Sequence, residues 1–394
     1  MSLILVLNAG SSSVKFALIE ISPSKSESTI ARGAVDGIGQ KPRWSVKRSD
    51  GSPSQSEDLL ATETTTHQNA VARILRWIED HYGLGALKAA GHRVVHGGAD
   101  FAAPVLLNDA TIAALKSLIP LAPLHQPHNL AAIESLRALA PDLPQIACFD
   151  TAFHTTVPDV ERNFALPRAI TGMGVRRYGF HGLSYHFIAD ELARTAPDLA
   201  KGRVVVAHLG NGASLCAMHG GKSVATTMGF SAVDGLMMGT RTGSIDPAVI
   251  FYLMRNDGMT AAEVEAMFYH QSGLLGVSGL SSDMRILRDA MPTHTQAREA
   301  VAMFTHRIIR EIGAMIAALG GIEGLVFTAG IGEHDAQLRS DVVNGLSFAG
   351  FSLDQAANEG HFSKISGKDG PTALVIPTNE ELMIARETAA TLNL

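Results

Sequence analysis

The sequence predicts an α/β protein that contains two related domains. Apolar runs with strand character alternate with segments in which apolar residues recur at helical spacing, a pattern typical of α/β folds. An apolar strand, a glycine-containing turn and a second apolar strand occur at residues 3–20 and again at residues 203–218. Such a repeated unit indicates duplication, and the chain of 394 residues is long enough for two domains of ordinary size.

The first strand–turn–strand unit has the residues of a phosphate-binding turn. Asn8 and Gly10 are followed by the hydroxyls of Ser11 and Ser13, and Lys15 adds a positive charge. Glycine permits a tight turn, and the hydroxyls and exposed amides of such a turn can hold phosphate oxygens. On these residues alone, an ordinary serine-rich hairpin remains the alternative. The second unit repeats the plan, so the pair could hold a phosphate chain from both sides; two unrelated hairpins are the alternative.

Further strands and helices follow from periodicity and breakers. In the N-terminal part we expect strands at 29–35, 93–96 and 145–149, helices at 67–82, 109–118 and 133–138, and a polar surface loop at 50–67. In the C-terminal part we expect strands at 224–228, 324–328 and 373–376, and helices at 185–193, 261–269, 299–319 and 380–392. Asn108 or Asp109 should cap the second helix, and Thr378 with Glu381 fits a capping box for the last one.

Composition excludes several classes of protein. The net charge is −6 and no basic tract is visible, which argues against nucleic acid as a partner. The N-terminus enters a strand at once, without the pattern of a secretory signal, and no apolar run approaches the length that spans a membrane. Cys148 and Cys216 lie in strand-like runs and suit small buried residues in a reducing compartment. We therefore expect a cytoplasmic protein.

Polar residues follow several predicted strands, where ligands gather in open α/β sheets. The loops begin at Asn8, Asp150, His208, Gly330 and Asn379. Asp150 is a candidate catalytic carboxylate, although it could equally cap a turn. Glu380 could bind a hydrated Mg²⁺ beside phosphates, or complement the dipole of the last helix.

Two arginines are candidates for binding anions. Arg93, on a short strand beside Val95, could hold a small carboxylate with its fork while Val95 lines an apolar pocket. His92 and His96 on the opposite face invite a zinc interpretation, but no third ligand is obvious nearby. Arg241 stands between glycines in a loop; it could meet an anion or be an ordinary surface arginine.

Together the segments closely resemble the acetate kinase family of short-chain acyl kinases. The motifs that carry the resemblance are LNAGSSSVKF, GHRVVHGG, PLHQPHN, FDTAFH, RRYGFHG, HLGNGAS, MGTRTG, SSDMR, TAGIGEH and PTNEELMIAR, which run in this order from residue 7 to residue 386. The resemblance implies two duplicated ribonuclease-H-like domains of the actin and sugar-kinase type, with a cleft between them. It also implies reversible transfer of phosphoryl from ATP to acetate, giving acetyl phosphate and ADP, with Mg²⁺ (or Mn²⁺) as cofactor.

The resemblance assigns roles to individual residues. Asn8 and Glu380 correspond to the metal site, and Asp150, His181 and Arg241 to the catalytic groups. Acetate would be bound by Arg93 and His125, in an acyl pocket lined by Val95, Leu124, Phe180 and Ala232. The nucleotide would contact the first hairpin at Ser11, Ser13 and Lys15. Its remaining contacts would be His208, Leu209, Gly210, Asn211, Gly212, Asp283, Met284, Arg285, Gly330, Ile331, Gly332, Glu333 and His334.

Four positions depart from the pattern common in the family. Met284 replaces a usual Phe and His334 a usual Asn, which puts base stacking and nucleotide selectivity in doubt. Ala232 stands where many members have a Pro in the acyl pocket, so a longer acid could enter. Ser244 replaces a common Asp, with no effect that the sequence indicates.

The resemblance also implies domain boundaries and a homodimer. Residues 1–150 and 380–394 would form the N-terminal domain, and residues 151–379 a C-terminal domain for nucleotide binding and dimerisation. The alternatives are a propionate or other short-chain acyl kinase of the same fold, an actin-like ATPase that acts as chaperone or filament, and a histidine-rich metallohydrolase.

Overall fold

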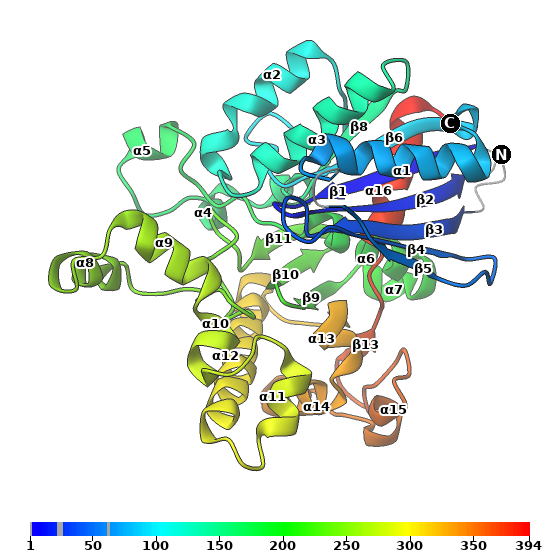
Figure 1. Ribbon diagram of the computed structural model, residues 1–394. Helices are drawn as coiled ribbons and strands as arrows, with labels where there is room; N and C mark the ends of the chain where they lie inside the picture. Colours follow the sequence, from blue (N-terminus) through cyan, green and yellow to red (C-terminus); the bar gives the residue numbers. More distant parts are fainter. Residues whose placement is uncertain (1, 22–26, 61–63) are drawn as a thin grey trace. The chain divides into compact units, whose positions relative to one another are not determined.

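The computed structural model describes residues 2–21, 27–60 and 64–394 (Figure 1). It has the predicted α/β class, with two mixed sheets. The chain divides into two compact units: residues 1–152 together with 379–394, and residues 153–378. They are called the N-terminal and the C-terminal unit below.

The sheet of the N-terminal unit has the strand order β5-β4-β3-β2-β1-β6-β8-β7. β1, β2 and β3 form antiparallel pairs, whereas β6 pairs parallel with both β1 and β8. The strands are β1 (Leu3–Ala9), β2 (Ser13–Ile21), β3 (Glu27–Asp36), β4 (Arg43–Arg48), β5 (Gln55–Asp58), β6 (Leu87–Val94), β7 (Val105–Leu106) and β8 (Gln145–Phe149).

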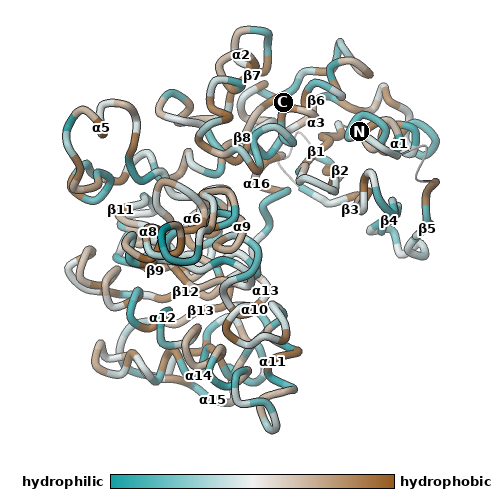
Figure 2. Tube along the Cα trace, turned by 60° about the vertical axis from the view of Figure 1, so that its left-hand side comes forward, coloured by the Kyte–Doolittle hydropathy of each residue, from teal (hydrophilic) through white to brown (hydrophobic). Residues whose placement is uncertain are grey.

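Helices cover both faces of this sheet. Leu3, Leu5 and Leu7 of β1 share a core with apolar residues of α1 (His67–Tyr82) and α3 (Gln126–Leu139). Helix α1 is amphipathic: its buried apolar residues lie on the side that faces the sheet, and polar residues lie on the other side (Figure 2). The other face receives α16 (Glu380–Leu392): a Cβ on Gly91 of β6 would lie 2.5 Å from Ile384, so the glycine permits close packing. The unit also contains α2 (Asp109–Ser117), capped by Asn108 as one of the two predicted candidates.

The sheet of the C-terminal unit has the order β11-β10-β9-β12-β13. Its strands are β9 (Arg203–Leu209), β10 (Ala213–His219), β11 (Lys222–Thr226), β12 (Gly324–Thr328) and β13 (Thr372–Val375). β12 is parallel to β9 and β13, and the pairs of β10 are antiparallel.

Among the helices that pack on this sheet, α6 (Gly182–Thr195) contacts β9, and the long α12 (Thr295–Leu319) contacts β9, β10 and β11. The remaining helices are α4 (Asp159–Arg162), α5 (Arg168–Gly172), α7 (Pro197–Ala200), α8 (Pro247–Asn256), α9 (Ala261–His270), α10 (Gly273–Ser278), α11 (Met284–Ala290), α13 (Ala329–His334), α14 (Ala336–Gly345) and α15 (Gln355–Glu359). Single 3₁₀ turns lie at Leu84–Ala86, Ile119–Leu121, Ala152–Thr156 and Ser347–Ala349.

Several expectations about elements were wrong. The polar stretch 50–67, expected to be a loop, contains β5, which pairs with β4; its residues 61–63 lie outside the described residues. The strand expected at 93–96 begins earlier and ends at Val94. The last helix is capped by Asn379, whose side chain accepts from the Leu382 amide, and not by a Thr378–Glu381 box.

Candidate functional site

The turn between β1 and β2 is tight and is held from within. The Gly10 amide donates to the Ser13 carbonyl (2.8 Å), and Ser11 is exposed. His67 Nε2 donates to the Gly10 carbonyl (2.7 Å). Because a trans peptide points its N–H away from its C=O, this bond turns the Ser11 amide away from His67. Such an arrangement of exposed amide and hydroxyls suits phosphate oxygens.

Asn8 and Lys15 stand beside each other across this hairpin. They are direct cross-strand partners of β1 and β2, so their side chains share one face of the sheet. Leu7 and Ala9 belong to the core on the α1 side, so strand alternation directs Asn8 to the opposite face, on which α16 packs. Asn8 therefore faces the same side of the sheet as the helix that begins with Glu380.

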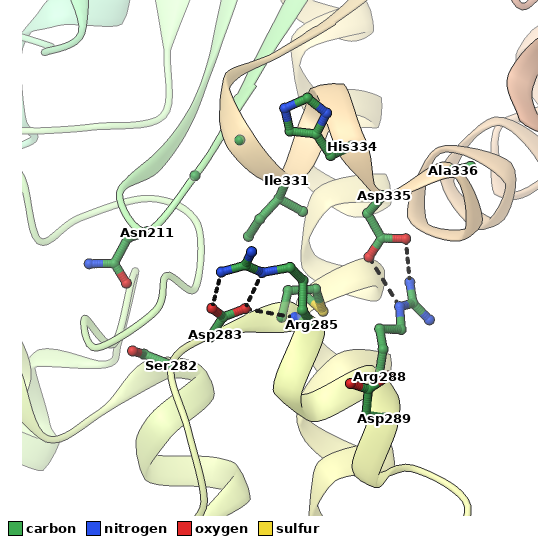
Figure 3. A pocket seen from close by; sticks show the side chains of 13 residues that line it. Asn211, Ser282, Asp283, Arg285, Arg288, Asp289, Ile331, His334, Asp335 and Ala336 are labelled. Carbon is green, nitrogen blue, oxygen red and sulfur yellow. Dashed lines mark hydrogen bonds and ion pairs between the residues drawn. The ribbon is translucent and has the colours of Figure 1, made fainter. Parts of the chain in front are cut away.

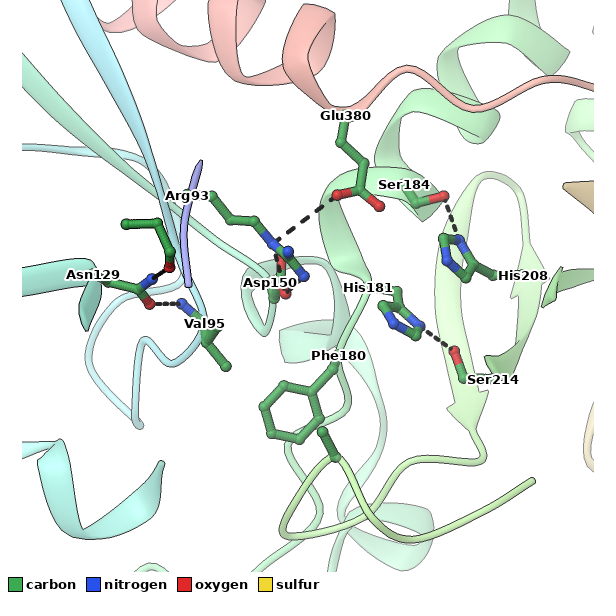
Figure 4. Close-up of polar contacts among 12 residues, drawn as sticks. Arg93, Val95, Asn129, Asp150, Phe180, His181, Ser184, His208, Ser214 and Glu380 are labelled. Carbon is green, nitrogen blue, oxygen red and sulfur yellow. Dashed lines mark hydrogen bonds and ion pairs between the residues drawn. The ribbon is translucent and has the colours of Figure 1, made fainter. Parts of the chain in front are cut away.

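Three charged residues form a cluster at the ends of β6, β8 and α16. Arg93 donates through Nε to Asp150 (3.1 Å) and through Nη2 to Asp150 Oδ2 (2.6 Å), a two-pronged pair, and its Nε lies 4.0 Å from Glu380 Oε2 (Figure 4). The Asp150 side chain is 2% exposed. Because Asp150 takes the Nε–Nη2 edge of Arg93, a bound carboxylate would meet the guanidinium from another side or displace Asp150.

Burial and neighbouring charges set the protonation of this cluster. Burial raises the pKa of Glu380 to about 7; Arg93 opposes this rise, and the carboxylates of Asp150 and Glu381 add to it. For Arg93, burial is outweighed by Asp150 and Glu380, which hold its pKa above the ordinary value. The raised pKa means that the neighbouring groups do not fully compensate the charge of the Glu380 carboxylate, so this carboxylate can still bind a cation. The oxygens of Glu380 and the amide oxygen of Asn8 form a donor set of the kind that Mg²⁺ prefers.

Of the other residues expected near the acid, Val95, Leu124 and His125 belong to this unit, whereas Phe180 and Ala232 belong to the C-terminal unit. Val95 directly follows β6 and is partly exposed; Leu124 is 39% exposed and precedes α3, whose N-cap is His125. His92 is buried and bonds Gln145 Oε1 (2.8 Å). Among the described residues, no group of three or more His, Cys, Asp or Glu side chains is placed to hold a metal ion.

In the C-terminal unit, His181 and His208 form a stacked pair. Their ring centroids lie 4.1 Å apart, His181 Nδ1 bonds Ser214 Oγ (2.9 Å), and His208 Nδ1 bonds Ser184 Oγ (2.8 Å) (Figure 4). His181 has φ +58°, an uncommon left-handed conformation at the start of α6. Such strain persists where the surroundings fix it, often at functional sites. Phe180, next to it, is almost fully buried.

Arg241 lies in the long irregular segment between β11 and α8. Its Nη1 donates to the Ala232 carbonyl (3.0 Å), and its guanidinium lies 5.9 Å from the centre of the Tyr269 ring. Ser244 Oγ donates to Asp234 (2.7 Å) in the same segment, so the serine that departs from the family pattern closes the loop that carries Arg241. Arg241 and Ala232 are thus joined directly within this unit.

A cavity of about 800 Å³ opens in the C-terminal unit (Figure 3). This volume suits a ligand of nucleotide size. Its lining includes eight of the residues expected to contact the nucleotide: Gly210, Asn211, Asp283, Met284, Arg285, Gly330, Ile331 and His334. Of the other residues expected there, His208 and Leu209 are buried strand residues, Gly212 lies beside His181, and Glu333 accepts from the Thr378 amide.

Sequence reasoning missed other residues of this cavity. Arg288 and Asp335 pair on its wall (3.1 Å), and Ser282, Asp289 and Ala336 complete the lining. Behind this lining, Arg339 is fully buried and donates to the carbonyls of Gly332 and Glu333 at the end of α13. A lone arginine in the sequence carries no signal of such a role, because the role depends on how α14 packs against α13.

Comparison with known proteins gives a full-length match. Residues 3–386 match the family model described as the acetokinase family. A curated acetate kinase of Rhodopseudomonas palustris is 52% identical over 388 residues, which cover 97% of this chain and 96% of that protein. Among solved structures, a propionate kinase from Francisella tularensis gives a TM-score of 0.93 at 37% identity, covering 99% of this chain and all of that one. The acetate kinase of Porphyromonas gingivalis gives 0.91 at 38% identity, with full coverage of both chains.

Proposed function

The chain belongs to the acetokinase family, and we propose that it transfers the γ-phosphoryl group of ATP to acetate, reversibly and with Mg²⁺, giving acetyl phosphate and ADP. The observation that carries this is the full-length match, since it extends over every segment described above as a candidate site. An actin-like chaperone or filament protein and a histidine-rich metallohydrolase are set aside by the same match. A short-chain acyl kinase that also accepts propionate stays as second candidate, because a propionate kinase is among the similar structures and Ala232 replaces a common proline.

We propose that the two units divide the substrates. The nucleotide occupies the cavity lined by Asn211, Met284 and Gly330, and the acid is bound by residues of the N-terminal unit. Arg93 attracts the carboxylate, and His125 with Val95 and Leu124 shapes its surroundings. Ser11, Ser13 and Lys15 of the first hairpin hold phosphate oxygens. Asn8 and Glu380 hold Mg²⁺, which would neutralise charge on the phosphoryl oxygens.

The chemical step needs little covalent help from the protein. A carboxylate is already a nucleophile, so in-line transfer requires positioning and stabilisation of charge on the equatorial oxygens. Arg241 and His181 supply donors for those oxygens. The Asp150 carboxylate, fixed by Arg93, orients that guanidinium and forms no phosphoenzyme. Ser214 fixes the ring of His181, so this donor is held before the substrate arrives.

An acyl-hydroxamate assay tests the activity. With ATP and Mg²⁺, the purified protein should convert acetate to acetyl phosphate, which hydroxylamine traps; the reaction should stop when EDTA removes the metal. Parallel assays with propionate and butyrate separate the two candidates. No acyl phosphate from any of the three acids would overturn the proposal, and a covalent aspartyl phosphate at Asp150 would overturn direct transfer.

We also propose a homodimer formed through the C-terminal unit. Helix α8 has no buried residue, and Phe251 and Tyr252 are 52% and 58% exposed. A contiguous exposed patch of large apolar side chains marks an interaction surface, and we place the dimer contact at this helix. Light scattering should give twice the mass of the chain, and Tyr252→Asp should shift it toward the monomer. A monomeric wild type would contradict the proposal.

The described residues contain no helix with the length and apolar character that crossing a bilayer requires. Cys148 and Cys216 are both buried and unbridged, as expected for small core residues. These thiols fit the cytoplasmic location that we propose for the enzyme.

A further inference from the structure

Asn129 of α3 joins the two strands of the N-terminal unit that carry its candidate site. Its side chain is 3% exposed. Nδ2 donates to the Ala9 carbonyl (2.8 Å), and Oδ1 accepts from the Val95 amide (3.0 Å; Figure 4 shows the second bond). Asn129 ends the segment at residues 123–129, of which the family resemblance uses Leu124 and His125.

The bridge occurs where the backbone ladder stops. β1 and β6 pair in parallel up to Leu7 and His92. Ala9 is the last residue of β1, and Val95 is the first after β6. A side-chain amide offers one donor group and one acceptor, as a peptide does, so Asn129 continues the pairing where the strands no longer pair. Only one orientation of the amide satisfies a carbonyl on one side and an N–H on the other, and therefore the geometry is determined.

Each bonded residue adjoins a group of the candidate site. Ala9 lies between Asn8 and Gly10 of the phosphate hairpin, and Val95 is two residues from Arg93. His67 fixes the next carbonyl of the hairpin, that of Gly10. Hence two buried or partly buried side chains fix successive carbonyls of the hairpin, and only Asn129 of these two also reaches the strand of Arg93.

We propose that Asn129 is a positioning residue that keeps the phosphate hairpin in register with the strand of Arg93. It touches neither substrate; it acts through Ala9 and Val95. This inference rests on the proposed function, because it assigns the hairpin to Mg²⁺ and phosphate and β6 to the acid. Its signature is that one side chain changes the Michaelis constants of both substrates, although it binds neither of them.

Asn129→Ala removes both bonds. By analogy with residues that orient metal ligands, kcat/KM for acetate should fall about 10- to 100-fold, with a rise in the Mg·ATP concentration that half-saturates the enzyme. The matched control is Leu136→Ala, a fully buried residue of the same helix on its apolar side. It should lower the melting temperature and leave both Michaelis constants at their wild-type values.

Asn129→Asp is the sharper test, because the introduced carboxyl group has an O–H donor when it is protonated and none when it is ionised. Protonated, it can donate to the Ala9 carbonyl and accept from the Val95 amide, as the asparagine does. Ionised, it loses the donor and sets a negative oxygen against the Ala9 carbonyl. The ratio of its kcat/KM to that of the wild type should therefore be near one at acidic pH and fall about tenfold per pH unit above the pKa of the new carboxyl.

The outcomes separate the two levels of the argument. If the wild type forms no acyl phosphate, the proposed function fails. If the wild type is active, the positioning role is overturned by either of two results: Asn129→Ala that melts early but keeps wild-type Michaelis constants and kcat, or an Asn129→Asp ratio that is constant from pH 5.5 to 8.5. Should Asn129→Ala not fold, the pH profile of Asn129→Asp decides alone.

Discussion

In the N-terminal unit the strands β3, β2, β1, β6 and β8 lie side by side, and in the C-terminal unit β11, β10, β9, β12 and β13 follow in the corresponding order. Each series has two antiparallel pairs followed by two parallel ones. The first turns also correspond: the Gly10 amide bonds the Ser13 carbonyl, and the Gly210 amide bonds the Gly212 carbonyl. The two units thus share one strand plan, as a duplicated ancestor would leave it.

The equivalent strand ends carry different chemistry. Arg93 at the end of β6 and Asp150 directly after β8 form a partly buried ion pair, whereas the counterparts β12 and β13 lead to the Gly330 segment and to Thr378. The C-terminal unit has an open cavity bordered by backbone at Gly210 and Gly330. A shared scaffold therefore fixes where ligands can bind, and the side chains at the strand ends decide which ligand. Charge in one unit suits a small anion and a metal, and space in the other suits a nucleotide.

The largest effect should come from the two arginines, one in each unit. Arg241→Ala should lower kcat about 10³-fold, by analogy with the loss of an arginine that stabilises phosphoryl transfer. The hydrogen bond to the Ala232 carbonyl accounts for about 1 kcal/mol of the free energy of unfolding, so stability should fall far less than activity. Steady-state kinetics and chemical denaturation measure the two quantities.

Arg93→Ala should lower activity and stability together. The KM for acetate should rise, because the variant lacks the guanidinium proposed to bind the carboxylate. The free energy of unfolding should fall by about 3–5 kcal/mol, because the 2%-exposed Asp150 carboxylate loses its partner. Arg93→Lys should restore part of each, since an ammonium lacks the two-pronged geometry. Equal stability of the Arg93 and Arg241 variants would contradict the contrast drawn between the two units.

Next in size is the effect expected at the proposed metal site of the N-terminal unit. Glu380→Gln should reduce kcat/KM about 100-fold or more, by extension from residues that only orient metal ligands. In the wild type, the Mg²⁺ concentration for half-maximal rate should rise about tenfold per pH unit below 7, because Mg²⁺ competes with the proton on Glu380. A Mg²⁺ requirement that does not vary between pH 5.5 and 8 would remove Glu380 from the metal site.

The same substitution, Glu380→Gln, should lower activity but raise stability at high pH. Its pKa in the folded protein, about 7, lies above the reference value of 4.5, so protonation favours the folded state. The stability contributed is fully present below pH 4.5 and is lost as pH rises through 7. Without Mg²⁺ at pH 8, Glu380→Gln should thus be more stable than the wild type by about 1–3 kcal/mol.

Some helices and strands could be predicted from the sequence better than others. The hairpins and α12 were predicted because their apolar periodicity is local. β5 was missed because all its residues are exposed, and only its pairing with β4 makes it a strand. The helix expected at 133–138 begins at Gln126. Its start was missed because the first turns are polar: the side chains of Gln126 and Asn129 donate to main-chain carbonyls of other segments.

The candidate site shows the same division. Arg93, Asp150 and Glu380 were each placed near the end of a strand or at the start of a helix by their local patterns, but the Arg93–Asp150 bond joins residues 57 apart in sequence. The periodicity of apolar residues is a local signal and cannot show that two residues so far apart in the sequence form a bond. The roles of Arg339 and Asn129 depend likewise on main-chain groups that folding brings to them. Residue type and strand ends were therefore predictable, and partners were not.

A smaller effect concerns His92, which lies beside Arg93 but faces the interior. Burial lowers the pKa of His92 to about 4, against a small opposing effect of Gln145, so the folded state holds it neutral. Its stabilising contribution is present above the reference pKa of 6.5 and is lost as pH falls through 4, about 3 kcal/mol in all. His92→Gln should flatten the loss of stability between pH 6.5 and 4 in denaturation experiments. An equally steep loss in the variant would assign acid sensitivity to other groups.

The smallest effect should be on the choice of acid, which tests the proposal that Ala232 of the C-terminal unit lines the acyl pocket. Ala232 has a small side chain, and its carbonyl accepts from Arg241, so the segment also holds a proposed catalytic group. One methylene in an apolar pocket is worth about 1–3 kcal/mol of discrimination. With the wall at 232 reduced to a methyl group, propionate should be used within about tenfold of acetate, and butyrate less well.

Ala232→Pro keeps the carbonyl that accepts from Arg241, so it should raise the preference for acetate and leave the ATP KM unchanged. The hydroxamate assay with the three acids measures both ratios. A propionate-to-acetate ratio that Ala232→Pro does not alter would mean that residue 232 touches no acyl group and does not set the choice of acid.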